Sequence, residues 1–157
     1  MKKGFTLIEL LIVMVLVGVL VTVALPKYYS SMERGRAMEG INNLRAASDY
    51  INARYIMDGN AYLSASDYVD SSGKLMGDFT KPVYFSAPTV KSASGATVVI
   101  TLSRESGEYT LDATNTDGEL KEMTCIPAAG AELAANQKLC ENIGFELSGS
   151  QYVMTLN

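Results

Sequence analysis

The stretch from Lys2 to Pro26 reads KKGFTLIELLIVMVLVGVLVTVALP, and the rest of the chain is organised around it. Its 21 residues from Phe5 to Leu25 contain one ionisable side chain, Glu9, and no proline. As an α-helix these residues extend about 31 Å, close to the roughly 30 Å hydrocarbon thickness of a bilayer. The stretch therefore predicts a helix that is long and apolar enough to cross a membrane.

Glu9 is the exception within this apolar run. A carboxylate inside a membrane helix costs about 2.5–3.5 kcal/mol on insertion scales, so something must offset that cost. One interpretation places Glu9 near the interface, in a first helical turn where the helix dipole favours negative charge. The other gives Glu9 a partner of opposite charge on a neighbouring molecule.

Residues 2–9, KKGFTLIE, resemble the class III signal of type IV pilins and of the related pseudopilins of type II secretion. The resemblance covers residues 1 to about 30. In that family a prepilin peptidase in the membrane cuts after the glycine and methylates the new amino terminus. The resemblance implies cleavage between Gly4 and Phe5, N-methylation of Phe5 and retention of the apolar helix. An ordinary secretory signal would instead be cut after its apolar region and lost.

Composition limits the classes of protein that fit. The 157 residues suggest one domain and an anchor, and 48% apolar with 19% charged residues is neither fibrous nor disordered. Removal of the leader, residues 1–4, leaves 11 basic against 17 acidic side chains. Such an acidic chain argues against a broad basic surface for nucleic acid, although a small basic patch remains compatible with it. Residues 5–29 are the predicted transmembrane and polymerisation helix, and residues 30–157 the predicted globular domain.

The outer part of the apolar helix contains residues that weaken helices. Gly18 and Thr22 lower helix propensity, and Pro26 removes a backbone donor, which costs about 3 kcal/mol inside a continuous helix. We expect a kink or a local loss of helix there. The resemblance implies that the segment between Gly18 and Pro26 loosens when subunits enter a filament.

The helix is expected to continue beyond an interfacial anchor, Lys27-Tyr28-Tyr29, because residues 30–57 contain no proline. Spacings of three and four residues define a stripe on one helix face, which predicts packing against the chain's own core. Asp58-Gly59-Asn60 should end the helix. The members of the stripe are Ala37, Ile41, Leu44, Ser48, Ile51 and Tyr55.

The remaining residues predict mostly strands, and hence an α+β fold in which the second half of the helix packs on an antiparallel sheet of about four strands. Residues 61–81 read as a connection with a short helical turn near 64–69. Turns are expected at 103–107 and 115–118, and a closing hairpin around 148–150. An alanine-rich segment, 128–140, predicts a short helix. The expected strands are 83–85, 97–102, 108–113, 120–126, 145–147 and 152–156.

Cys125 and Cys140 are the only cysteines. In an oxidising compartment they would form a disulfide worth about 3 kcal/mol, and free buried thiols are the alternative. Type IV pilins commonly enclose a C-terminal loop with such a pair, so the resemblance implies the disulfide. A zinc site is excluded because the chain has no histidine and too few thiols.

Enzymatic chemistry finds no support in the sequence. Without histidine, neither a Ser-His-Asp nor a Cys-His arrangement can form, and no phosphate-binding GxxxxGK motif is present. Residues 115–118, NTDG, are similar to the middle of a calcium loop, but Ala113 and Thr124 occupy two of its ligand positions. We therefore expect no enzymatic activity, no cofactor and no metal.

The resemblance implies a structural subunit of a type IV pilus, a filament used for adhesion, twitching motility or DNA uptake. Its implied partners are further copies of the chain, the peptidase, the membrane, and the assembly platform and motor. The precursor would span the cytoplasmic membrane once, with residues after Pro26 outside the cytoplasm, and the filament would be extracellular. Filament assembly would pair the Phe5 amine with Glu9 of a neighbour. The alternatives are a type II secretion pseudopilin and a membrane-anchored periplasmic binding domain or enzyme.

Overall fold

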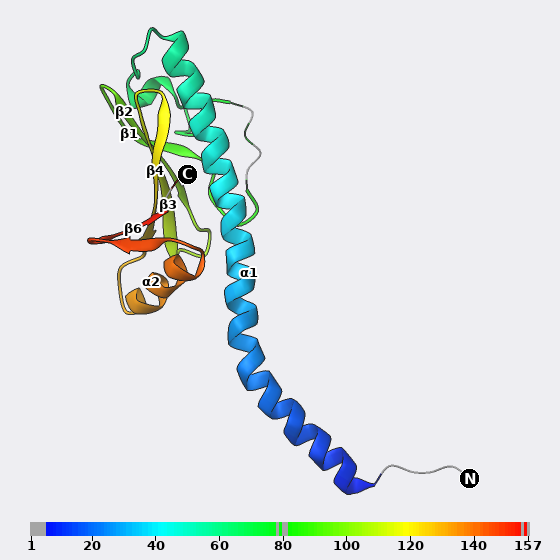
Figure 1. Cartoon of the computed structure of the whole chain (residues 1–157). Helices are drawn as coiled ribbons and strands as arrows, with labels where there is room; N and C mark the ends of the chain where they lie inside the picture. Colours follow the sequence, from blue (N-terminus) through cyan, green and yellow to red (C-terminus); the bar gives the residue numbers. More distant parts are fainter. Residues whose placement is uncertain (1–5, 78, 80–81, 155, 157) are drawn as a thin grey trace.

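A single long helix, α1 (Leu7–Met57), runs through the computed structural model, which describes residues 6–77, 79, 82–154 and 156. Thr6 caps its amino end. Its carboxyl end is followed by Gly59 and Asn60 with positive φ angles of 83° and 62°, which confirms the predicted stop signal. The last part of α1 lies along the sheet, and the first part extends away from the domain (Figure 1).

Pro26 lies inside α1, and the helix is continuous through it. The expected local loss of helix is therefore absent from the isolated chain. Figure 1 shows instead that α1 curves where it leaves the sheet. Thr22, four residues before Pro26, donates its hydroxyl to the carbonyl of Val19 at 2.7 Å, a side-chain contact that often bends helices.

The sheet has six antiparallel strands in the order β1-β2-β3-β4-β6-β5. Strands β1 to β4 follow one another as hairpins, and the β5–β6 hairpin adds beside β4 through β6 (Figure 1). The α+β fold is confirmed, with six strands where about four were expected. The bounds are β1 (Thr89–Ser94), β2 (Thr97–Ser103), β3 (Tyr109–Thr116), β4 (Glu119–Pro127), β5 (Glu146–Ser148) and β6 (Gln151–Met154).

The predicted strand at 83–85 is wrong. The backbone N–H groups of Val83 and Tyr84 donate to the carboxylate of Glu39 on α1, at 2.9 and 3.2 Å, instead of to a neighbouring strand. Only an isolated bridge between Phe85 and Arg104 remains. The true edge strand, β1, was not predicted because its sequence, TVKSAS, lacks the apolar alternation of a strand with one buried face.

Two-residue turns close three of the four hairpins in the described chain, and residues 104–108 join β2 to β3. Between β3 and β4, Asp117 and Gly118 have φ angles of 53° and 79°, as a type I′ turn requires. This turn and the one at Gly149 confirm predicted turns. The short elements are η1 (Ala65–Asp67), which confirms the helical turn expected near 64–69, and α2 (Leu133–Asn142), which begins later than the expected 128.

The core lies between one face of the sheet and the second half of α1. The predicted stripe is confirmed, since five of its six members are buried and Tyr55 is half-buried. The helix packs tightly at Gly40, where an added Cβ atom would lie 2.9 Å from the ring of Phe85 and 3.1 Å from Leu111. Only glycine leaves room for the ring at that point.

Candidate functional site

The first part of α1 buries no side chain against the rest of the described chain. Every side chain from Leu7 to Tyr29 is exposed, and the apolar ones remain 43–92% accessible up to Leu25. Among the described residues, α1 is the one helix long and apolar enough to cross a membrane. An apolar surface of this extent marks a contact with lipid or with other protein.

Glu9 lies in the first turn of α1 and caps it together with Thr6. The Thr6 backbone N–H and hydroxyl both donate to Glu9 Oε2 at 2.8 Å, and the Glu9 N–H donates back to the Thr6 hydroxyl at 3.4 Å. Oε1 of Glu9 accepts no hydrogen bond from the residues that the structure describes. The carboxylate therefore serves its own helix with one oxygen and leaves the other open.

Gly18 and Pro26 lie within the exposed part of α1, and no other side chain comes within 4 Å of a Cβ atom built on Gly18. Gly4 and Phe5, the predicted cleavage and methylation residues, lie outside the described residues. The structure thus places Glu9, Gly18 and Pro26 along one free helix and does not bring them together.

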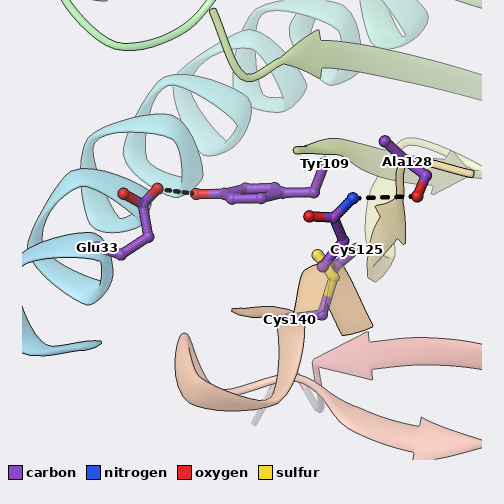
Figure 2. The surroundings of a disulfide bond; sticks show 6 residues. Glu33, Tyr109, Cys125, Ala128 and Cys140 are labelled. Carbon is purple, nitrogen blue, oxygen red and sulfur yellow. Dashed lines mark hydrogen bonds between the residues drawn. A yellow bond between two sulfur atoms is a disulfide. The ribbon is translucent and has the colours of Figure 1, made fainter. Parts of the chain in front are cut away.

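A disulfide joins Cys125 of β4 to Cys140 of α2, with 5.8 Å between the Cα atoms (Figure 2). It confirms the predicted pairing and rules out free thiols in this structure. Both cysteines are buried. A second contact holds the same loop, because the Asn136 amide donates to the carbonyl of Ala128 at 3.1 Å. Together they fix α2 against the base of the sheet.

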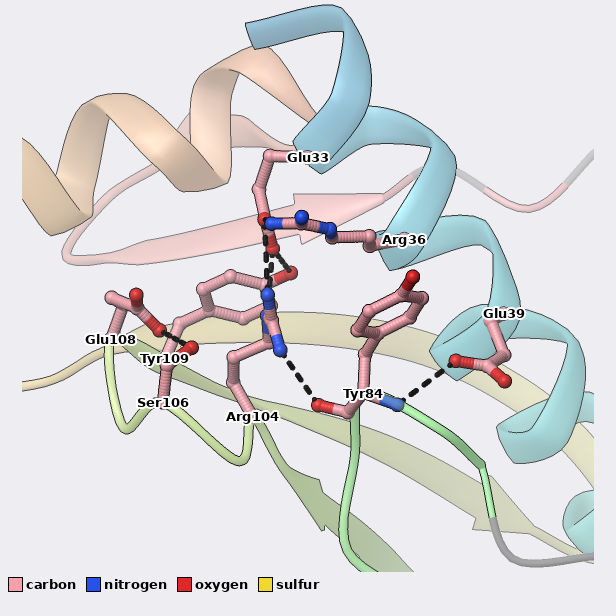
Figure 3. Close-up of polar contacts among 8 residues, drawn as sticks. All are labelled: Glu33, Arg36, Glu39, Tyr84, Arg104, Ser106, Glu108 and Tyr109. Carbon is pink, nitrogen blue, oxygen red and sulfur yellow. Dashed lines mark hydrogen bonds and ion pairs between the residues drawn. The ribbon is translucent and has the colours of Figure 1, made fainter. Parts of the chain in front are cut away.

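A polar cluster lies where α1 first meets the sheet (Figure 3). Glu33, 9% exposed, is the first buried residue of α1. Arg104 donates to its two carboxylate oxygens, from Nε at 2.8 Å and from Nη2 at 3.2 Å. Tyr109 donates its hydroxyl to Glu33 Oε1 at 2.8 Å, and Arg36 adds a longer contact at 3.3 Å. Four donor atoms, from α1, the β2–β3 turn and β3, therefore converge on one buried carboxylate.

The electrostatics of this cluster favour an ionised Glu33. Burial acts to raise the pKa of Glu33, but the hydrogen bonds from Arg104 and Tyr109 and the charge of Arg104 outweigh it and lower that pKa. Burial and the same carboxylate raise the pKa of Tyr109 well above its usual range. Glu33 thus stays charged and Tyr109 stays a donor at neutral pH.

The NTDG segment, residues 115–118, contributes to a hydrogen-bond network that connects β3 and its turn to α1. Asn115 is fully buried on β3, and its Oδ1 accepts from the Asn52 amide of α1 at 3.2 Å. Tyr62 donates to Asn52 at 2.8 Å and accepts from the Gly118 N–H at 3.1 Å. Within the described residues, no three His, Cys, Asp or Glu side chains are grouped so that they could hold a metal ion.

Comparison with known proteins gives consistent matches. A family model described as the prokaryotic N-terminal methylation motif matches residues 1–25. A "Type IV major pilin protein PilE" of Neisseria gonorrhoeae is 36% identical over 84 residues, and a "Fimbrial protein" of Neisseria meningitidis serogroup B is 34% identical over the same length. "Fimbrial protein EcpC" of Eikenella corrodens is 30% identical over 105 residues.

The chain belongs to the type IV pilin family.

The matches cover this pilin unevenly. The two neisserial matches include 53% of this chain and the Eikenella match 67%. The chain spans about half the length of the two neisserial relatives and 64% of the Eikenella protein. No solved structure matches it. The methylation motif coincides with the stretch that the sequence singled out, and the long helix on an antiparallel sheet is consistent with the pilin fold.

Sequence reasoning did not find the polar cluster of this pilin, although one signal pointed to it. Extending the buried stripe back by one turn from Ala37 leads to Glu33, a carboxylate on an otherwise apolar face. Such a residue needs a cationic partner when it is buried. The partner itself, Arg104, lies 71 residues away and carries no local signal.

Proposed function

We propose that this pilin is a structural subunit of a type IV pilus, held in the membrane by the free part of α1 and polymerised through it. The observation that carries the proposal is the exposed apolar helix from Leu7 to Leu25, at the position of the N-terminal methylation motif. A domain with its own core does not need this helix. Lipid would cover it in the precursor, and helices of other copies would cover it in a filament.

The apolar face alone does not favour a filament over the membrane. Lipid chains are as apolar as leucine, so moving α1 from lipid into a bundle of helices gains little from the hydrophobic effect. The free-energy cost of the Glu9 charge differs between the two environments. In lipid its charge is costly, whereas in a filament it would face a cation.

Cleavage by the peptidase would create that cation. The Gly4–Phe5 amide is uncharged, and cutting it produces an amine at Phe5. Oε1 of Glu9 in a neighbouring copy would accept a hydrogen bond from this amine, while Oε2 accepts hydrogen bonds from Thr6 of its own copy. Processing would thus switch on a contact that also sets how far one subunit is displaced along the next.

Two measurements test the proposal. Electron microscopy of cells with and without the gene should show surface filaments that are lost on deletion and restored by complementation. Mass spectrometry of the amino terminus should find N-methyl-phenylalanine. An intact Met1 in filaments would refute the processing step.

The same deletion strain separates the pilus from the pseudopilin alternative. Loss of exoprotein secretion, with surface filaments unchanged, would identify a pseudopilus subunit. Loss of filaments with normal secretion supports the pilus.

A further inference from the structure

The polar cluster occupies a particular place on α1. The described side chains before Ser30 are all exposed, and Glu33 is the first buried residue of α1. The cluster therefore lies where the free helix ends and the attached helix begins (Figures 1 and 3). Any displacement of the free helix relative to the domain reaches this point first.

The contact between Glu33 and Arg104 is directional. The guanidinium presents Nε and Nη2 to the two carboxylate oxygens as a fork, a geometry that a small sliding movement breaks. Arg104 is itself held, since it is 7% exposed and donates Nη1 to the carbonyl of Tyr84 at 2.9 Å. The apolar contacts of the stripe have no such direction and tolerate small shifts.

A slip of α1 along the sheet by one helical turn, about 5.4 Å, has no equivalent partner. It would bring Tyr29 or Ala37 to the place of Glu33, and neither carries a carboxylate. The same slip would bring Arg36 or Leu44 to the place of Gly40, where even a Cβ atom would lie 2.9 Å from Phe85. Two independent features, the paired hydrogen bonds of Arg104 to Glu33 and the tight packing at Gly40, therefore fit only one axial position of α1 on the sheet.

We propose that Glu33, Arg104 and Tyr109 are positioning residues that lock the axial register of α1 on the sheet. Their role in assembly rests on the function proposed above. In a filament the free helix would contact neighbouring copies, and the lock would set the height of each outer domain relative to those contacts.

The test uses the full chain in detergent micelles and reports register directly. Spin labels carried by unnatural amino acids at Met38 and Ser94, both exposed, leave the disulfide intact. The wild type should give one narrow distance distribution. Glu33→Gln and Arg104→Lys, which remove the charge or the fork but keep similar size, should broaden it or add a population displaced by about one helical turn.

Amide hydrogen exchange separates a register lock from general stabilisation. In Glu33→Gln, the increase in exchange at α1 residues 33–41 should exceed the general increase at the β3 and β4 amides by about tenfold. Two controls accompany it. Glu39→Gln removes another α1 carboxylate, which holds residues 83 and 84, and Ile100→Val weakens the core without touching the cluster.

The outcomes are distinct. An unchanged distance distribution in both cluster variants would overturn the lock. So would an exchange pattern in Glu33→Gln that matches the general increase in Ile100→Val. If the wild type formed no filaments in cells, the proposed function would fail, while the micelle measurements would still decide the register lock.

Discussion

Two carboxylates of α1 show how surroundings determine what a residue does. The Glu9 side chain is exposed and, among the described residues, hydrogen-bonds with Thr6 alone, so one oxygen is available to another molecule. Glu33 is buried and receives four hydrogen bonds from its own chain. We therefore propose that Glu9 makes contacts between copies, whereas Glu33 makes contacts within one copy.

Replacing Glu9 with alanine should block assembly and leave insertion and processing intact. The variant loses the acceptor for the neighbour's amine, and removing a charge from an apolar helix does not hinder insertion. Filament yield by electron microscopy should fall severely, while the mass of the mature amino terminus stays that of the processed chain. Asp49→Ala, which removes an exposed carboxylate of the same helix, is the matched control. Normal incorporation of the Glu9 variant would remove this role.

Glu33 should make stability depend on acid. Its folded pKa lies below the unfolded value of about 4.3, so its contribution is complete above that value and is lost as pH falls through the folded pKa. At pH 7 Glu33→Gln should lower the free energy of unfolding by about 3 kcal/mol, the lower end of the cost of breaking a buried pair.

The measurement for Glu33 is denaturant unfolding between pH 7 and pH 2. The difference between the wild type and Glu33→Gln should shrink toward the acid end, because the wild-type carboxyl is then protonated too. Arg104, Arg36 and Tyr109 face this carboxyl and remain in both proteins. A constant difference across the range would contradict the prediction.

At the scale of elements, the long helix is attached to the sheet by contacts of different kinds. Most of the buried residues of α1 are apolar, Gly40 packs tightly against Phe85, and the polar cluster adds directional hydrogen bonds. At the base of the sheet, the disulfide attaches α2 to β4 in the same region as the cluster (Figure 2). The junction between helix and domain therefore has a buried ion pair and a disulfide in the same region.

Two glycines of α1 should respond to alanine with opposite signs. Gly35 is exposed with nothing within 4 Å of a Cβ atom, so Gly35→Ala should stabilise by about 0.5–1 kcal/mol. At Gly40 the added methyl group would press on the buried Phe85, and overpacking costs about 1–3 kcal/mol, more than the gain in helix propensity. Chemical unfolding of both variants checks this. Equal stabilisation would show that the Phe85 ring yields freely.

At the scale of the whole molecule, the chain divides by environment. The exposed part of α1 contributes no buried side chain to the core up to Tyr29, whereas the rest of α1 and the sheet form the domain (Figure 1). The boundary expected between residues 29 and 30 stays a prediction, which a truncated chain can test. The membrane or the filament would cover the apolar surface of the first part, whereas the second part buries its apolar side chains in its own core.

A chain that begins at Ser30 should therefore fold as a soluble monomer. It keeps Glu33, the stripe and the disulfide, and a serine at the amino end of a helix is a favourable cap. Its thermal midpoint should lie within a few degrees of that of the domain in the full chain, and sedimentation should show one copy. A chain that begins at Ala37 lacks Glu33 and should melt at a lower temperature. Equal midpoints for the two would argue against the stabilising role of the cluster.

By itself, the sequence determined the features whose signals are local. A 21-residue apolar run, turn residues with positive φ, a stripe of three and four spacings and a lone pair of cysteines each encode their result within a short window. The length of an apolar run can be compared directly with the thickness of a bilayer, and backbone sterics decide which residues adopt a positive φ angle. Neither comparison needs knowledge of distant residues. The long helix, its end and most strands followed from these local signals, and the family resemblance favoured the disulfide over free thiols.

Only the tertiary structure decided which distant residues meet. Residues 83–85 look like a strand, but their N–H groups bond to Glu39 across 44 and 45 residues, and β1 forms without the usual alternation. Glu33 meets Arg104 and Tyr109 across 71 and 76 residues. Partners so far apart are chosen by the packing of helix on sheet, where a buried charge must find its counterpart, and no local pattern records that choice.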